Sequence, residues 1–402
     1  MIRLASCDKA GRIAFSRSRE GLADGGTVRR VSPNELIPAP AGTVPMVLCG
    51  RHPRVRDGVA KRRHALAVAL PAGYTRLLLP AFEREESAPA LPLFGYTFAC
   101  AVSDELHVAA MRTDESEDWE PRKFARGRLE RIISRKLRTD PENRALRQLA
   151  LCAREYGCFT AQNVFLERGE AALPISPACN ARCIGCISQL EPEAGIPSPQ
   201  ERIRNEASAR ELARVATAHL ERVDAGIVSF GQGCEGEPLL RSLTMARTIE
   251  LIRGARSNGT VNLNTNGSMP RGLQRCIDAG LQAVRVSLNS FRPQVYAAYY
   301  RPMGYSLEDV LDSVRLAVRS GLRVSLNLLT HPGVTDDEEE VVAAQAFLRS
   351  TPVHMVQTRT LNIDPEWYFD AVGRPQAPLG MRAAIEALAK TGARIGNFTH
   401  TH

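Results

Sequence analysis

Three cysteines stand within eight residues of one another, at Cys179, Cys183 and Cys186. Three thiolates on one short segment can surround one metal centre, and three assignments compete. A structural zinc ion usually takes a fourth Cys or His ligand, and the neighbouring sequence supplies none. A disulfide would leave one cysteine over, and disulfides are rare in cytosolic proteins. An iron–sulfur cluster held by three cysteines leaves one iron open to a small molecule, to which it can pass an electron.

Polar and glycine residues recur downstream, each near the end of an apolar run. They are Gly236, Glu237 and Pro238 after GIVSFGQGCE, Asn264, Asn266 and Gly267 in TVNLNTNG, Ser287 and Asn289 in AVRVSLNS, and Asn327 in LRVSLNLLTH. A carboxylate with exposed carbonyls suits an ammonium group, and glycine lets the backbone approach a ligand closely. Asn amides both donate to and accept from hydroxyl groups. Each residue alone is also common in turns or at strand ends, so only their joint order is informative.

Alternating strands and helices must position these residues. Strands are expected over 171–178, 225–232, 260–267, 283–290, 322–331 and 354–363, with helices over 207–223, 239–255, 272–280, 293–300, 306–321, 336–350 and 379–392. Right-handed crossovers place such strands side by side and parallel. Six units are fewer than a closed barrel has. We therefore expect an α/β fold with a partial (β/α)6 TIM-like barrel, whose ligands sit at the carboxyl ends of the strands.

The first part of the chain has a different pattern. Short apolar runs over 43–50, 64–82, 91–102 and 105–111 are broken by turn residues and predict short strands, and helices are expected over 124–137 and 142–157. The length of 402 residues favours two domains. We expect an N-terminal module over 1–168, with short strands followed by a basic helical region, and a partial barrel over 169–402. The module is the candidate for setting specificity.

The order of these residues resembles the radical S-adenosylmethionine (SAM) superfamily. The CxxxCxxC spacing follows the first strand, a Gly-Glu-Pro turn the second and an Asn-Gly pair the third, as in that family. The resemblance implies that Cys179, Cys183 and Cys186 hold a [4Fe–4S] cluster. It implies that SAM binds at Gly236, Glu237, Pro238, Asn264, Asn266, Gly267, Ser287, Asn289 and Asn327. One departure is Gly185, since the family often has an aromatic residue there that contacts adenine.

The function implied by the resemblance is that of a radical SAM enzyme. One electron from the reduced cluster cleaves SAM to methionine and a 5′-deoxyadenosyl radical, which abstracts a hydrogen atom from an unidentified substrate. The resemblance also implies an electron donor such as flavodoxin or ferredoxin, and it names no further catalytic residue. The alternative is a non-catalytic metal-binding or iron–sulfur sensing protein, which leaves the Gly-Glu-Pro and Asn-Gly elements unexplained.

The charge and hydropathy of the chain bear on which partners it can bind. The net charge is +8, and the segment from Pro121 to Tyr156 holds eleven Arg and Lys against four Asp and Glu. A solvated helical face is the simpler interpretation, and an anionic or macromolecular substrate such as RNA is the alternative. No apolar run indicates a secretory signal or a membrane span, so we expect a cytoplasmic protein with no membrane partner.

Some further residues have more than one interpretation each. Cys152 and Cys158 are either structural residues or ligands of a second cluster. Cys234 is a small buried residue, a substrate-side thiol or a ligand of such a cluster. Several polar and aromatic residues near strand ends are either substrate contacts or structural caps and ion pairs, namely Arg359, Asn362, Asp364, Trp367 and Tyr368. His331 is either a proton donor or a structural residue.

Overall fold

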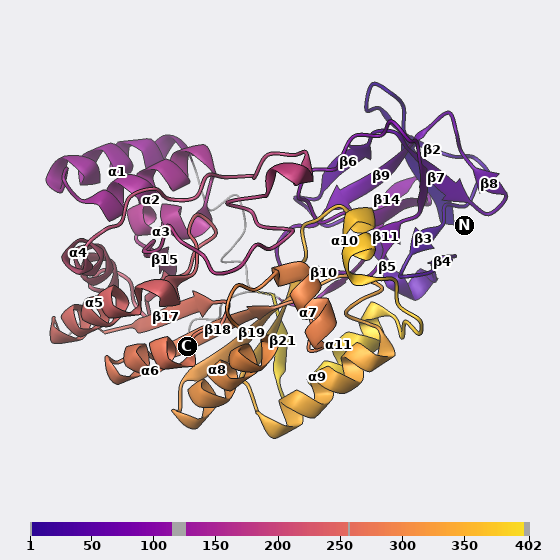
Figure 1. Ribbon diagram of the computed structural model, residues 1–402. Helices are drawn as coiled ribbons and strands as arrows, with labels where there is room; N and C mark the ends of the chain where they lie inside the picture. The colour runs from indigo at the N-terminus through magenta and orange to yellow at the C-terminus, as the bar shows by residue number, and fades with distance from the viewer. Residues whose placement is uncertain (1, 115–125, 256–257, 398–402) are drawn as a thin grey trace.

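The computed structural model describes residues 2–114, 126–255 and 258–397. Within that part, the chain begins with short antiparallel strands, continues through three helices, and ends with parallel strands that alternate with helices (Figure 1). None of the described helices combines the length and the apolar character needed to cross a membrane.

The N-terminal strands form one large sheet and two small ones. Their bounds are β1 (Ile2–Cys7), β2 (Ile13–Phe15), β3 (Ala23–Asp24), β4 (Val28–Arg29), β5 (Leu36–Pro38), β6 (Val44–Leu48), β7 (Arg51–Val55), β8 (Gly58–Val59), β9 (His64–Ala69), β10 (Tyr74–Arg76), β11 (Leu79–Pro80), β12 (Phe82–Arg84), β13 (Thr97–Val102) and β14 (Glu105–Arg112), with a 3-10 turn η1 (Pro33–Glu35). The large sheet has the order β10-β14-β13-β1-β9-β6, and β2 and β5 pair with β1 and β14. The small sheets are β11-β3-β4 and β12-β7-β8. The apolar runs over 43–50, 64–82, 91–102 and 105–111 all contain strands, as the sequence predicts.

Three helices follow, α1 (Arg126–Thr139), α2 (Arg144–Glu155) and α3 (Phe159–Leu166). Their buried side chains, including Leu129, Ile133 and Leu149, belong to the same hydrophobic cluster as the parallel sheet. This packing groups the helices with the second half of the chain, and the domain boundary at residue 168 stays a prediction. Residues 121–125 of the basic region lie outside the described residues.

The second half is an α/β unit that forms a partial TIM-like barrel. Its strands are β15 (Glu170–Ala172), β16 (Ile227–Phe230), β17 (Thr260–Thr265), β18 (Ala283–Leu288), β19 (Arg323–Thr330), β20 (Met355–Thr360) and β21 (Arg394–Gly396). Its helices are α4 (Ala209–Leu220), α5 (Ser242–Gly254), α6 (Pro270–Asp278), α7 (Pro293–Tyr300), α8 (Leu307–Arg319), α9 (Glu338–Ser350), α10 (Pro365–Val372) and α11 (Met381–Ala389), with 3-10 turns η3 (Pro192–Ala194) and η4 (Pro238–Arg241). The seven strands pair in sequence order, β15 to β21, and every pair is parallel. The structure adds β21 to the six expected strands, and the first strand is shorter than expected.

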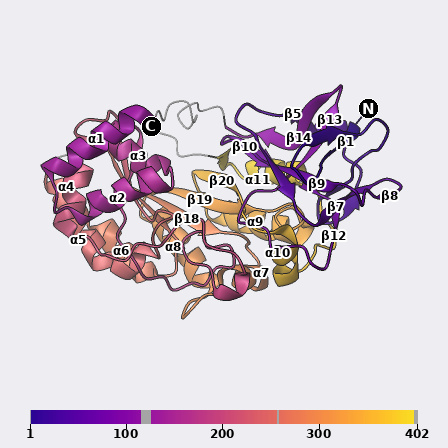
Figure 2. The ribbon, with the colours of Figure 1, turned by 90° about the horizontal axis from the view of Figure 1, so that it is seen from above.

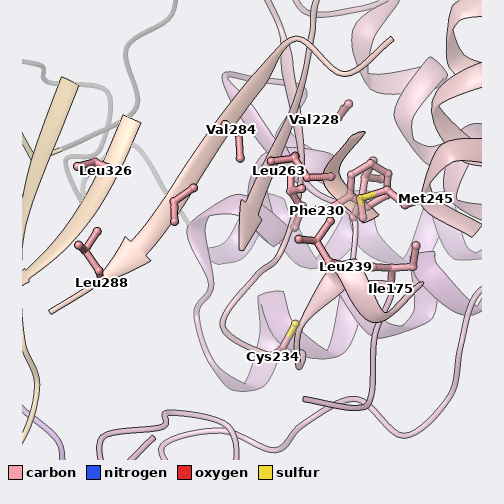
Figure 3. Packing of buried hydrophobic residues seen from close by; sticks show 14 of the residues in the cluster. Ile175, Val228, Phe230, Cys234, Leu239, Met245, Leu263, Val284, Leu288 and Leu326 are labelled. Atoms are coloured by element: carbon pink, nitrogen blue, oxygen red, sulfur yellow. The ribbon is translucent and has the colours of Figure 1, made fainter. Parts of the chain in front are cut away.

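The two faces of this sheet differ in polarity. Successive residues of a strand point to opposite faces. Apolar side chains such as Val228, Leu263, Val284 and Leu326 occupy alternate positions and pack in the core that the helices complete (Figure 3). The intervening positions carry Ser229, Asn262, Asn264, Arg285, Ser287, Asn327, Gln357 and Arg359. Parallel strands are usually apolar on both faces, so this polar face indicates a polar ligand site.

The N-terminal strands lie beside the last elements of the chain, next to α10, α11 and β20 (Figures 1 and 2). Arg51, which is fully buried, forms an ion pair with Asp364 at 2.8 Å. The hydroxyls of Thr75 and Thr358 lie 2.7 Å apart. The guanidinium of Arg76 donates across the same boundary to the carbonyls of residues 330 and 361, where β19 and β20 end. The N-terminal unit therefore borders the carboxyl ends of these strands.

Candidate metal centre and ligand pocket

The segment with the three cysteines follows β15 and is held by the end of α7. The amide of Ile184 donates to the carbonyl of Tyr299 at 3.0 Å, and the amide of Met303 donates to the carbonyl of Asn180 at 2.9 Å. Both bonds join backbone to backbone, so they fix the path of the segment independently of its side chains. The cysteines are thus presented on a braced loop at the carboxyl end of the sheet.

The thiols of Cys179, Cys183 and Cys186 lie close enough to influence one another electrostatically. Burial, and then the neighbouring Cys186 and Cys179, raise the pKa of the Cys183 thiol well above its ordinary value. Burial is also the main cause that raises the pKa of Cys179. Three thiolates crowded in this way need a positive centre between them.

This donor set fits an iron–sulfur cluster. In residues 2–114, 126–255 and 258–397, no three or more His, Cys, Asp or Glu side chains are placed to hold a single metal ion. A cluster of several irons is larger than one ion, so its thiolates need not converge on one point. Cys179, Cys183 and Cys186 are each partly exposed on one loop, as ligands that surround such a body must be.

The turn after β16 approaches the cysteine loop so closely that only glycine fits. The amide of Gly236 donates to the carbonyl of Ser176 at 2.7 Å, and that of Glu237 donates to the carbonyl of Ala178 at 2.8 Å. A Cβ atom on Gly236 would lie 1.9 Å from the Ala178 oxygen. Glu235, just before this glycine, binds the cysteine segment from the other side by accepting from the amides of Ile175 and Ser176. The Gly-Glu-Pro turn and the metal loop are therefore one rigid assembly.

The Glu237 carboxylate is buried beside this loop. It accepts from the Asn266 amide at 2.8 Å, the Leu239 amide at 2.9 Å and the Thr265 hydroxyl at 2.5 Å. Burial raises its pKa to about 7. No Arg, Lys or His of the described residues forms an ion pair with it. A cationic ligand would supply the missing charge, because an ion pair offsets the cost of burying a carboxylate.

The predicted residues after β17 act as braces. The Asn266 side-chain amide donates to Asn180 Oδ1 at 2.9 Å, and the Asn180 amide donates to the Ser268 hydroxyl at 2.9 Å. Gly267 has a φ of +71°, and a Cβ there would lie 2.9 Å from Val286. Asn266 and Gly267 thus join the cysteine loop to the sheet.

The remaining predicted ligand residues lie on the polar face or at its end. Asn264 accepts from Arg285 at 3.0 Å and donates to the Gly231 carbonyl at 3.1 Å, so its amide is engaged within the protein. Asn327 donates to the Ser287 hydroxyl at 3.0 Å, and Asn289 donates to the Tyr368 hydroxyl at 3.0 Å.

The oxygen atoms Asn327 Oδ1 and Asn289 Oδ1 are buried and have no hydrogen-bond donor among the residues that the structure describes. Leaving a buried acceptor unpaired costs about 1–3 kcal/mol. Each oxygen can therefore accept a hydrogen bond from a hydroxyl group of a ligand.

An aromatic side chain fills the space beside Gly185. A Cβ there would lie 2.9 Å from the Tyr299 hydroxyl oxygen and 3.2 Å from its Cε2 atom. Tyr299 stands edge-on to Tyr300, with ring centroids 5.0 Å apart. Gly185 has no side chain before the third cysteine, and the Tyr299 ring from α7 occupies that space instead. Sequence reasoning missed Tyr299, because nothing in the spacing connects the two positions.

Most of the other strand-end candidates are structural. Asp364 caps α10 and pairs with Arg51. Tyr368 is fully buried, and His331 is fully buried and donates from Nδ1 to the Pro332 carbonyl. Arg359 differs, because its side chain stays open to water on the polar face.

The fold brings a second group of thiols together. Cys152 and Cys158 are joined by a backbone hydrogen bond of 3.1 Å at the end of α2, and the neighbouring Cys234 thiol lowers the pKa of the Cys152 thiol. Cys152 and Cys234 are buried. Figure 3 shows Cys234 in the loop beyond Phe230.

We expect about four irons per chain in fully reconstituted protein, because a [4Fe–4S] cluster on the first cysteine loop accounts for that number. Iron and sulfide quantitation will measure it. The Cys234→Ser variant is the matched test and should bind the same amount of iron. A wild-type value near eight irons, falling on this substitution, would assign a second cluster to Cys152, Cys158 and Cys234.

Comparison with known proteins gives three kinds of match. Residues 173–344 match the family model described as the radical SAM superfamily. The FeMo cofactor biosynthesis protein NifB of Klebsiella pneumoniae is 25% identical over 252 residues, which cover 57% of this chain and 51% of that protein. The GTP 3',8-cyclase of Heliobacterium modesticaldum is 29% identical over 229 residues, covering 56% and 63%. A radical SAM methyltransferase of known structure from Sphaerobacter thermophilus aligns with 16% identity and a TM-score of 0.41, covering 56% of this chain and 64% of that one. The chain spans little more than half the length of the curated relatives it matches.

Proposed function

Because the chain belongs to the radical SAM superfamily, whose cofactors are a [4Fe–4S] cluster and SAM, we propose that it cleaves SAM reductively and directs the resulting radical to a C–H bond of its substrate. The observation that carries this proposal is the joint assembly of the three cysteines with Glu237. One loop bears Cys179, Cys183 and Cys186. The backbone amide of Glu237 donates to the Ala178 carbonyl just before this loop, which places the buried Glu237 side chain beside it.

The chemistry supplied by the bound cofactors is the one-electron cleavage of a carbon–sulfur bond. The protein's part is binding and orientation. Glu237 would accept the ammonium group of SAM, since it is a buried carboxylate that lacks a cationic partner among the described residues. The unpaired oxygens of Asn289 and Asn327 would accept the ribose hydroxyls. Gly236 and Asn266 would hold these groups at a fixed distance from the cysteines.

The test is anaerobic. The protein is reconstituted with iron and sulfide, reduced with dithionite, and supplied with SAM, and 5′-deoxyadenosine is measured by liquid chromatography and mass spectrometry. We expect its formation to require both the cluster and the reductant. Reconstituted protein that carries the cluster but neither binds SAM nor forms 5′-deoxyadenosine would favour the non-catalytic iron–sulfur alternative. In the cell, a flavodoxin or ferredoxin would replace dithionite.

An anionic substrate is supported by Arg359. Its guanidinium lies on the polar face of the sheet and donates to the Asn397 carbonyl at 2.6 Å. No carboxylate of the described residues forms an ion pair with it. Burial, and then the nearby Arg285 cation, lower the pKa of Arg359, while the Glu170 carboxylate raises it. A guanidinium on the polar face that has no ion-pair partner is suited to bind a carboxylate or phosphate group.

We expect this anion to be small rather than an RNA. The arginines at positions 128, 131, 135 and 138 are exposed on α1, as on a solvated helical face, while the Arg359 site lies on the sheet. RNA binding measured across salt concentrations should therefore be weak, and an Arg131→Gln/Arg135→Gln double variant should not change it. Tight binding that falls steeply with salt and is lost in the double variant would instead indicate a macromolecular substrate.

A further inference from the structure

One of the three cysteines receives hydrogen bonds from two side chains. Arg202 Nη2 donates to Cys186 Sγ at 3.4 Å. Arg202 Nε donates to the Ser188 hydroxyl at 3.2 Å. Because that hydroxyl accepts from Arg202, its own hydrogen is free to point at Cys186 Sγ, which lies 3.6 Å away. The third cysteine is thus held by a cation and by a hydroxyl that the same cation orients.

The backbone around Arg202 fixes this arrangement. The Gln200 amide donates to the Ile187 carbonyl at 3.2 Å, and the Ile203 amide donates to the Cys234 carbonyl at 2.8 Å. The segment is therefore tied both to the cysteine loop and to the turn after β16. Ser188 is buried, so its hydroxyl has little access to water.

The charge of Arg202 is not cancelled by a neighbour. Its side-chain hydrogen bonds in the described part of the chain go to Ser188 and Cys186, and none goes to a carboxylate. Its positive field also lowers the pKa of Cys179 and Cys183, against the larger effect of burial. A guanidinium without a counter-ion beside three thiols interacts most strongly with whatever negative charge those thiols carry.

We propose that Arg202, with Ser188, is a positioning residue that sets the reduction potential of a cluster bound at Cys179, Cys183 and Cys186. Adding one electron to such a cluster increases the negative charge that it shares with its thiolates. Hydrogen bonds to the sulfurs and a nearby cation stabilise that reduced form, so they raise the potential. The inference rests on the proposed function only in assuming the cluster, not in assuming SAM cleavage.

The experiment is a reductive titration of reconstituted protein, followed by the electron paramagnetic resonance of the reduced cluster. Arg202→Met removes the charge and keeps most of the side-chain volume. Arg202→Lys keeps the charge but cannot donate to Ser188 and Cys186 at the same time from a planar guanidinium. Arg204→Met is the matched control, because Arg204 is exposed two positions away and pairs with Glu201 at 3.0 Å.

We expect Arg202→Met to lower the ratio of reduced to oxidised cluster about tenfold at a fixed potential, which corresponds to ~59 mV for one electron. Arg202→Lys should fall between this variant and the wild type, and Arg204→Met should match the wild type. An unchanged potential in Arg202→Met at equal iron content would overturn the proposal. If Arg202→Met fails to load iron, the reduction potentials of Ser188→Ala and Arg202→Lys test the proposal instead. A lowered potential in either supports the proposal, and an unchanged potential in both overturns it.

The two proposals fail in different ways. A wild-type cluster that is reduced but does not cleave SAM contradicts the proposed function and leaves the role of Arg202 measurable. Conversely, a variant with an unchanged potential in a protein that does form 5′-deoxyadenosine contradicts only the role of Arg202.

Discussion

Replacing any one of Cys179, Cys183 and Cys186 by Ala will abolish the formation of 5′-deoxyadenosine from SAM. Each thiolate would hold one iron of the cluster. The loop that bears them is fixed by backbone hydrogen bonds to α7, so no other cysteine can move in to replace a missing ligand. We expect the iron content of reconstituted protein to fall with the activity. Iron quantitation and mass spectrometry of the reaction products will measure the two effects.

The matched control is Cys49→Ser, because Cys49 is an exposed free cysteine in the N-terminal unit. This variant should keep both the iron and the activity. A Cys→Ala variant of the loop that still forms 5′-deoxyadenosine at the wild-type rate would sink the assignment of the metal centre.

Replacing Glu237 by Gln will weaken SAM binding about ten- to a hundredfold. A hydrogen bond to a charged group contributes about 1.5–3 kcal/mol, and every 1.4 kcal/mol changes Kd about tenfold. Gln has nearly the same size, but it is neutral and offers one oxygen where the carboxylate uses two, toward Thr265 and Asn266. Equilibrium dialysis with SAM will measure the change.

Two controls separate the loss of the ammonium contact from a damaged pocket. Glu193→Gln alters an exposed carboxylate in η3 and should bind SAM as the wild type does. The ligand 5′-methylthioadenosine lacks the amino acid part of SAM, so Glu237→Gln should leave its affinity unchanged. Equal SAM affinity in Glu237→Gln and the wild type would contradict the assigned role. Equal losses for both ligands would point to a structural effect.

Much of the α/β unit can be predicted from sequence, because its signals are local. The strand ends at Asn264, Ser287 and Asn327 alternate with apolar residues, and this period of two is enough to distinguish one polar face of the sheet from one apolar face. The glycine of the Gly-Glu-Pro turn likewise predicts that another backbone segment or a ligand approaches closely, because glycine has no side chain in the way. The last strand, β21, is not predicted, because its three residues provide too little alternating pattern.

The contacts that complete the site are not local, and sequence reasoning missed them. Tyr299 fills the space beside Gly185 from another element, and a glycine gives no sign of what packs against it. Arg202 is one of 52 Arg and Lys residues, and only the fold places it against Cys186. Asn264 and Asn266 carry the predicted residue types, yet their amides are used largely to brace the protein itself.

The buried ion pair between Arg51 and Asp364 has a consequence for biosynthesis. The two residues are 313 positions apart. A ribosome adds about 5–20 residues per second, so Arg51 emerges roughly 15–60 seconds before its partner exists. During that interval the N-terminal strands must survive with an unpaired cation on the surface that will later be covered. The N-terminal strands can pack against the parallel sheet only after its last strands have left the ribosome. A chain that stops before Asp364 would leave this boundary exposed, where quality-control proteases can recognise it.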